Sequence, residues 1–188
     1  MNAAQRVAHN AAINDVIDAV SDSRCVTIAV MNGLALGGGL ELAMACDLRI
    51  AAAGVSMGLT ESRIGVFPGA GGTQRLPRLI GASQALHMML TGEPIDSGRA
   101  LQIGLVNEVV AQENLRQRTR EIANLLASRS APALAEMKRL VYQGMELPLV
   151  NGLRLERAAL SAILGSADYA EGLAAFEERR QPRFTGQI

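Results

Sequence analysis

One stretch decides how this chain folds: Gly33-Leu34-Ala35-Leu36-Gly37-Gly38-Gly39-Leu40-Glu41-Leu42-Ala43-Met44-Ala45-Cys46-Asp47. It follows residues 25–31, an apolar segment with β-branched side chains that is typical of a buried strand. It leads into residues 40–45, whose composition favours a helix. Strand, glycine turn and helix in this order direct backbone N–H groups into a cleft, where the helix dipole strengthens their attraction for an anionic oxygen. Because each glycine costs conformational entropy, we interpret the three glycines as room for a ligand; the alternative is close packing of strand and helix.

The composition is that of a globular protein. Hydrophobic residues make up 49% of the 188 residues and charged residues 19%, which argues against disorder. Lys and Arg number 18, as do Asp and Glu, so the net charge of zero gives no attraction for nucleic acid or an anionic membrane. No apolar run approaches a membrane span, and the N-terminus has no signal-peptide core. Cys25 and Cys46 lie in apolar segments, which predicts buried free thiols and a reducing, cytoplasmic location.

Strands and helices alternate in the first part of the sequence. The pattern predicts helices over residues 3–20, 40–45, 73–80 (capped by Thr73), 83–90 and 96–102 (capped by Asp96), and strands over residues 25–31, 47–53, 55–59 and 106–110. From about residue 112 onward it predicts helices only. We therefore expect an α/β domain with a mostly parallel sheet over residues 1–110 and a helical region over residues 111–188.

Two glutamates are candidates for acid–base chemistry. Glu41 and Glu61 each lie near the start of an expected helix, among apolar neighbours. Two carboxyl groups close together in such surroundings have pKa values that are pushed apart, as an acid and a base require. The alternative is that each is an ordinary first-turn acid favoured by the helix dipole. His9 and His87 have no partner at metal-ligand spacing, so no metal site is predicted.

The chain resembles the enoyl-CoA hydratase/isomerase, or crotonase, superfamily. Besides residues 33–47, the segments that carry the resemblance follow in the family's order: residues 57–61, 64–78, 90–92, 100–107 and the C-terminal Glu171, Gly172, Phe176, Arg180 and Phe184. The resemblance implies a right-handed spiral of ββα turns. It also implies a C-terminal helical region that packs onto neighbouring subunits in homotrimers, often paired into hexamers.

The resemblance also assigns roles to individual residues. Matched onto the family's motif, the site residues are Glu41 and Glu61 as the catalytic glutamates, Gly38 with Gly37 beside it as an oxyanion donor, Gly69 near the reacting carbons, and Arg179 as a contact to coenzyme A of an adjacent subunit. An alternative for Arg179 is a solvated position in the charged cluster over residues 177–180. The implied activity is addition of water to a 2-enoyl-CoA thioester in fatty-acid or branched-chain acyl-CoA breakdown. No cofactor is implied, because coenzyme A enters with the substrate.

Two other functions stay open at this point. The first is isomerisation of the double bond by Glu61 alone, although glutamate at both positions favours hydration. The second is a non-catalytic subunit that binds acyl-CoA or other protomers. The family's usual N-terminal region, which supplies a second oxyanion donor, has no counterpart in the sequence, so the expected core is N-terminally truncated. Loss of one such donor costs about 2.7–4 kcal/mol, so we expect residues 1–188 alone to hydrate slowly or not at all.

Overall fold

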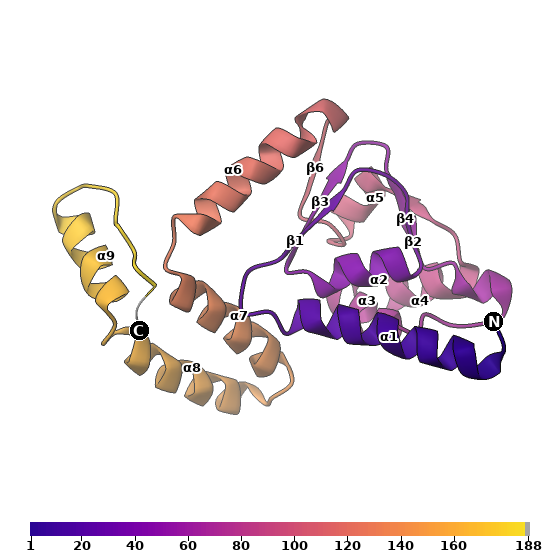
Figure 1. The fold of residues 1–188 in the computed structure, drawn as a ribbon, viewed down its shortest axis with the longest axis horizontal. Coiled ribbons are helices and arrows are strands. Elements are labelled where there is room, and N and C mark those ends of the chain that lie inside the picture. Colours follow the sequence, from indigo (N-terminus) through magenta and orange to yellow (C-terminus); the bar gives the residue numbers. More distant parts are fainter. Residues whose placement is uncertain (187–188) are drawn as a thin grey trace. The chain divides into compact units, whose positions relative to one another are not determined.

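The structure is a computed structural model that describes residues 1–186. It divides into two compact units: Met1–Ser23 with Thr27–Thr119, and Arg24–Val26 with Arg120–Ile188. The first unit has α/β structure and the second is helical (Figure 1). Within residues 1–186, no helix combines the length and apolar character needed to cross a bilayer.

A parallel sheet lies at the centre of the first unit. Its strands β1 (Ile28–Met31), β3 (Leu48–Ala52) and β6 (Glu108–Val110) stand in the order β1-β3-β6. Ile28 pairs with Leu48 on one side of β3, and Ile50 pairs with Glu108 on the other. The central strand is buried, which explains its run of small and aliphatic residues. The sheet is parallel, as predicted.

A second, smaller sheet lies beside the glycine turn. It contains β2 (Ala35–Leu36), β4 (Ser56–Gly58) and β5 (Ile95–Asp96). Strand β2 runs parallel to β4, whereas β5 runs antiparallel to it. The pairing of β2 with β4 brings the chain before the glycine turn next to the chain before Glu61.

Helices cover these sheets. They are α1 (Ala3–Ser21), α2 (Gly38–Ala45), α3 (Gly72–Ile80), α4 (Ala82–Thr91) and α5 (Ser97–Gln102), with 3₁₀ turns η1 (Glu61–Ile64) and η2 (Gln112–Asn114). Helix α2 packs between α1 and α3, and α3 packs on α4. The Asp96 side chain caps α5 as predicted, by accepting from the Arg99 N–H. The prediction for Thr73 is wrong: the residue before α3 is Gly71, with a φ of 101° that favours glycine.

The two cysteines correct a second expectation. Cys25 is exposed and Cys46 is half-buried, and neither forms a disulfide. Cys25 precedes β1, which begins only at Ile28, and Cys46 is the residue that follows α2. Each thiol therefore lies at the end of an apolar segment rather than inside it, and the prediction of buried thiols is wrong.

The second unit consists of helices. Helix α6 (Leu115–Ala127) begins in the first unit, and α7 (Ala131–Met145), α8 (Leu149–Ile163) and α9 (Ala167–Glu177) follow. Ser130 and Ser166 cap α7 and α9 through their hydroxyl oxygens. Helix α7 packs along α8. Among the described residues after 110 there are helices and no strand, and the main segment of the second unit begins at Arg120 rather than at residue 111.

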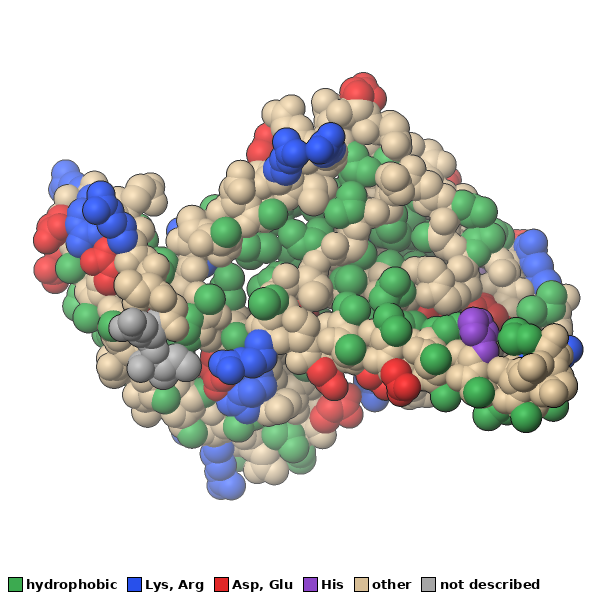
Figure 2. Space-filling view, viewed as in Figure 1, with side chains coloured by type: hydrophobic (Ala, Val, Ile, Leu, Met, Phe, Trp, Pro, Cys, Tyr) green, Lys and Arg blue, Asp and Glu red, His purple; other side chains and the backbone are tan. Residues whose placement is uncertain are grey.

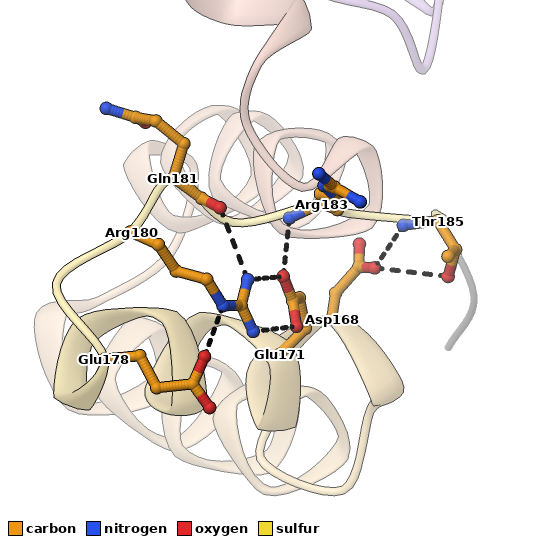
Figure 3. Close-up of polar contacts among 7 residues, drawn as sticks. All are labelled: Asp168, Glu171, Glu178, Arg180, Gln181, Arg183 and Thr185. Carbon is orange, nitrogen blue, oxygen red and sulfur yellow. Dashed lines mark hydrogen bonds and ion pairs between the residues drawn. The ribbon is translucent and has the colours of Figure 1, made fainter.

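Two carboxylates on α9 hold the chain that follows it (Figure 3). The Arg180 guanidinium donates to both oxygens of Glu171, at 2.6 and 3.0 Å, and the Arg183 N–H donates to the same carboxylate at 2.6 Å. These hydrogen bonds, led by that from Arg180, lower the pKa of Glu171 to about 2. Asp168, which is buried, accepts from the Thr185 N–H at 2.8 Å. The residues after α9 are thus fastened to that helix by ionised groups.

Candidate active site

The glycine turn begins at a residue that has to be glycine. Gly37 has a φ of 53°, and its N–H donates to the Gly58 carbonyl oxygen at 2.9 Å. A Cβ atom at this position would lie 2.9 Å from Glu61 Oε1. Both the backbone conformation and the space therefore exclude a side chain. The close neighbour of the turn is the carboxyl group of Glu61.

The next two glycines lie in open space. Gly38 is the first residue of α2, so its N–H has no acceptor one turn back in the helix. A Cβ atom added to Gly38 or to Gly39 would meet no atom within 4 Å, and both residues are exposed. Packing inside the described chain does not require glycine at these two positions. Room for an external group next to the helix N-terminus is the interpretation that fits.

Glu41 is held by backbone donors from another loop. It lies in the first turn of α2 but is only 3% exposed. Its Oε1 accepts from the N–H of Ala70 and from the N–H of Gly72, both at 2.8 Å. Glu41 is therefore an acid in the first turn of α2, as the alternative had it, but one that is buried and bound by backbone N–H groups. These two donors fix where the carboxylate points.

Glu61 is the second carboxyl group of the site. It begins η1, immediately after the short extended segment that contains β4. Burial raises the pKa of Glu61; a backbone hydrogen bond opposes this, and the negative charge of Glu41 adds to the increase. Within residues 1–186, its Oε2 atom is buried and has no hydrogen-bond partner. The two glutamates thus interact electrostatically, and Glu61 holds its proton more firmly than an ordinary glutamate.

A hollow adjoins the glycine turn. It has a volume of about 390 Å³, within the range of small-molecule sites. Its lining residues come from β2, the glycine turn, η1 and the loop after α4, and they are Leu36, Gly37, Thr60, Glu61, Arg63, Ile64 and Pro94. Arg63 and Pro94 lie outside every motif identified in the sequence, and Thr60 belongs to the motif over residues 57–61 without a role assigned to it. Among residues 1–186, no group of three or more His, Cys, Asp or Glu residues is arranged to hold a metal ion.

The remaining candidates lie elsewhere. Gly69 is exposed, and a Cβ atom there would lie 3.6 Å from Oδ1 of Asn10 on α1, so it faces that helix at ordinary contact distance. It directly precedes Ala70, one of the donors to Glu41. Arg179 belongs to the second unit, where it is exposed and has a φ of 54° just after α9. The structure brings Gly37, Glu41 and Glu61 together within the first unit, and the contact of Arg179 to coenzyme A of an adjacent subunit stays a prediction.

The sequence profile described as enoyl-CoA hydratase/isomerase matches residues 1–187. The chain belongs to this family. It is 40% identical over 179 residues to the mouse mitochondrial methylglutaconyl-CoA hydratase, a match that covers 93% of this chain and 57% of that protein. It is 44% identical over 165 residues to mouse mitochondrial enoyl-CoA hydratase domain-containing protein 2, which covers 86% of this chain and 56% of the relative. The chain thus spans little more than half the length of these two relatives.

Solved structures of the family have the same fold. The crystal structure of the enoyl-CoA hydratase from Bacillus anthracis superimposes with a TM-score of 0.97 at 41% sequence identity. That alignment covers 99% of this chain and 72% of the bacterial one. The expected crotonase fold is therefore confirmed.

Replacing Gly72 by alanine should disturb the site through its main chain. The added Cβ would lie 2.6 Å from Pro68 Cβ and 2.9 Å from both Glu41 Oε1 and Leu59 Cδ1. We expect the free energy of unfolding to fall by about 1–3 kcal/mol, the usual cost of overpacking, in urea denaturation. Gly144→Ala is the control, because a Cβ there meets nothing within 4 Å inside α7. Equal stability of the two variants would contradict the crowding at Gly72.

Proposed function

We propose that this protein adds water to 2-enoyl-CoA thioesters. The observation that carries the proposal is the placement of two carboxyl groups, Glu41 and Glu61, beside an exposed helix N-terminus at Gly38. Hydration needs a donor for the thioester oxygen, a base for the attacking water and an acid for the α-carbon. The names of the two mouse relatives, a methylglutaconyl-CoA hydratase and an enoyl-CoA hydratase domain-containing protein, support the same chemistry.

The proposed reaction assigns one step to each group. Glu41 takes a proton from water as the water oxygen bonds to the β-carbon, and the electron pair of the double bond moves toward the thioester oxygen. The Gly38 N–H stabilises the charge that develops there. Glu61, whose pKa is raised by burial, delivers a proton to the α-carbon. Because the substrate is neither oxidised nor reduced, the proposal needs no redox cofactor, and it assigns no step to a metal.

The direct test is hydration of crotonyl-CoA, followed as loss of the absorbance of the conjugated thioester. We expect turnover to continue with a strong chelator present and without added nicotinamide. The assay compares residues 1–188 with the same chain preceded by the N-terminal segment of a similar hydratase. Turnover that requires an added metal or nicotinamide, or no turnover in either form, would refute the proposal.

Isomerisation is the second candidate. A single carboxyl group that accepts a proton at one carbon and returns it at another is sufficient for it. The buried Glu61 Oε2, which has no hydrogen-bond partner among residues 1–186, fits such a shuttle. The effects of replacing Glu41 separate the two candidates, as set out below.

We also propose that the protein acts as a homotrimer or hexamer. Large apolar side chains of the second unit are exposed: Leu149, Val150, Leu153, Leu160, Leu164, Leu173 and Phe176. Apolar surface of this extent marks an interface between proteins. Nucleic acid is not a proposed partner, since Figure 2 shows basic side chains in small groups with acidic ones among them on the face drawn. A cytoplasmic location stays a prediction, because several relatives are named as mitochondrial proteins.

A further inference from the structure

The hollow beside Glu61 contains one positively charged residue. Of its lining residues, only Glu61 and Arg63 are ionisable; Leu36, Ile64 and Pro94 are apolar. The guanidinium of Arg63 is thus the group in the hollow that can attract an anion, and burial raises the pKa of Glu61, the group of opposite charge.

The local backbone positions Arg63. Its N–H donates to the Thr60 carbonyl oxygen at 3.1 Å, which fixes the residue in η1. Its side chain passes over Gly92, where an added Cβ would lie 3.1 Å from Arg63 Cγ and 3.3 Å from Nε. Gly92 ends α4 with a φ of 65°, and the chain then continues to Pro94 in the wall of the hollow. Because Gly92 has no side chain, the Arg63 side chain can lie along this wall of the hollow.

The guanidinium group of Arg63 is not used by the fold. Within residues 1–186 it makes no hydrogen bond or ion pair. Other arginines of the same unit are engaged: Arg75 donates to the Ala70 carbonyl oxygen and pairs with Asp18, and Arg99 donates to Gln84. A guanidinium is the side chain best suited to bind a carboxylate through two parallel hydrogen bonds.

We propose that Arg63 binds a carboxylate at the far end of the acyl chain, so that the preferred substrates are coenzyme A thioesters of short dicarboxylic acids. Glu61 and Arg63 belong to the same 3₁₀ turn, and both line the one hollow. A carbon chain that meets Glu61 at its α-carbon therefore needs only a short extension to reach the guanidinium. This inference rests on the proposed function, because it assumes that the acyl group enters the hollow.

The test measures binding rather than turnover. Isothermal titration of residues 1–188 compares glutaryl-CoA with pentanoyl-CoA, which has the same chain length but no terminal carboxylate and, like glutaryl-CoA, no double bond to hydrate. We expect glutaryl-CoA to bind about tenfold more tightly or better, as a charge-assisted hydrogen bond gives. In Arg63→Gln the two affinities should become equal through loss of glutaryl-CoA binding alone. Arg63→Lys keeps the charge without the fork and should retain part of the preference.

Arg116→Gln is the matched control, since Arg116 is an exposed arginine of α6 that does not line the hollow. It should keep the full preference for glutaryl-CoA. Circular dichroism verifies the fold of each variant, and Arg63→Lys carries the test if Arg63→Gln does not fold. Equal affinity of the unmodified chain for both thioesters, or an unchanged preference in the Arg63 variants, would overturn the role of Arg63 and leave the proposed function standing. Binding of neither thioester would overturn the proposed binding at Arg63, whereas the proposed function is judged separately by the hydration assay.

Discussion

Glu61→Gln is expected to lower the turnover of 2-enoyl-CoA hydration by about 10²–10⁴, the contribution typical of a general acid or base. Glutamine has nearly the same shape as glutamate but carries no proton that it can deliver to the α-carbon. Substrate affinity should change little, because the lost interaction belongs to the transition state. The measurement is kcat for crotonyl-CoA in whichever form of the chain turns over.

The same variant has a pH-dependent effect on stability. The pKa of Glu61 lies above its ordinary value of 4.5, so the folded protein binds this proton more strongly than the unfolded chain does. Folding stability therefore falls as the pH rises from about 4.5 through the raised pKa, where the carboxyl group ionises in a buried position. Glutamine removes this loss. The difference in unfolding free energy, Glu61→Gln minus the unmodified protein, should increase over this pH range, and a decrease would contradict the buried setting of Glu61.

Glu41→Gln should reduce hydration by a similar factor, about 10²–10⁴, for a different reason. The amide oxygen of glutamine can still accept from the N–H groups of Ala70 and Gly72, so the side chain keeps its place. It cannot take a proton from water. Hydration of crotonyl-CoA and migration of the double bond in a 3-enoyl-CoA are measured in parallel. Glu113→Gln, in the exposed turn η2, is the control and should keep full activity.

The pattern of losses separates the two candidate reactions. Loss of hydration in both glutamate variants supports the hydratase. Loss of all activity in Glu61→Gln, with full activity retained in Glu41→Gln, would favour the isomerase. Glu41→Ala serves as a structural contrast, because it leaves two buried N–H groups without an acceptor, at about 1–3 kcal/mol each. Its stability should fall below that of Glu41→Gln.

Much of the fold follows from local pattern. The apolar segments that became β1 and β3 were predicted within a few residues, because a buried parallel strand reads as a continuous aliphatic run. Strands β2 and β5 contain two residues each, too few to show any periodicity. Thr73 was chosen as a helix cap from its side chain, whereas the backbone conformation of Gly71 places the start of α3.

Some residues of the candidate site could likewise be predicted from the sequence, and others could not. Glu41 and Glu61 were found because their residue type and motif carry a chemical meaning. The hydrogen-bond partners of Glu41 could not be predicted in this way. They are the backbone N–H groups of Ala70 and Gly72, and nearly every residue of a chain has such a group. Arg63 was missed because only the three-dimensional path of the loop at Gly92 shows that it borders the hollow. Burial raises the pKa of Glu61, while the separation of the two pKa values stays a prediction.

The anchoring of Glu41 bears on which mutations this protein can tolerate. A backbone N–H survives every amino-acid exchange except one to proline, so an exchange at Ala70 keeps the donor to the carboxylate provided that the new side chain fits the core beside Ile17 and Ala45. Gly72 is restricted by volume instead, since any side chain there meets Pro68 and Glu41. Amino-acid exchanges in this loop are therefore tolerated when the new side chain fits and the residue is not proline. The conformation of the main chain, rather than any side chain of the loop, determines the orientation of the Glu41 carboxylate.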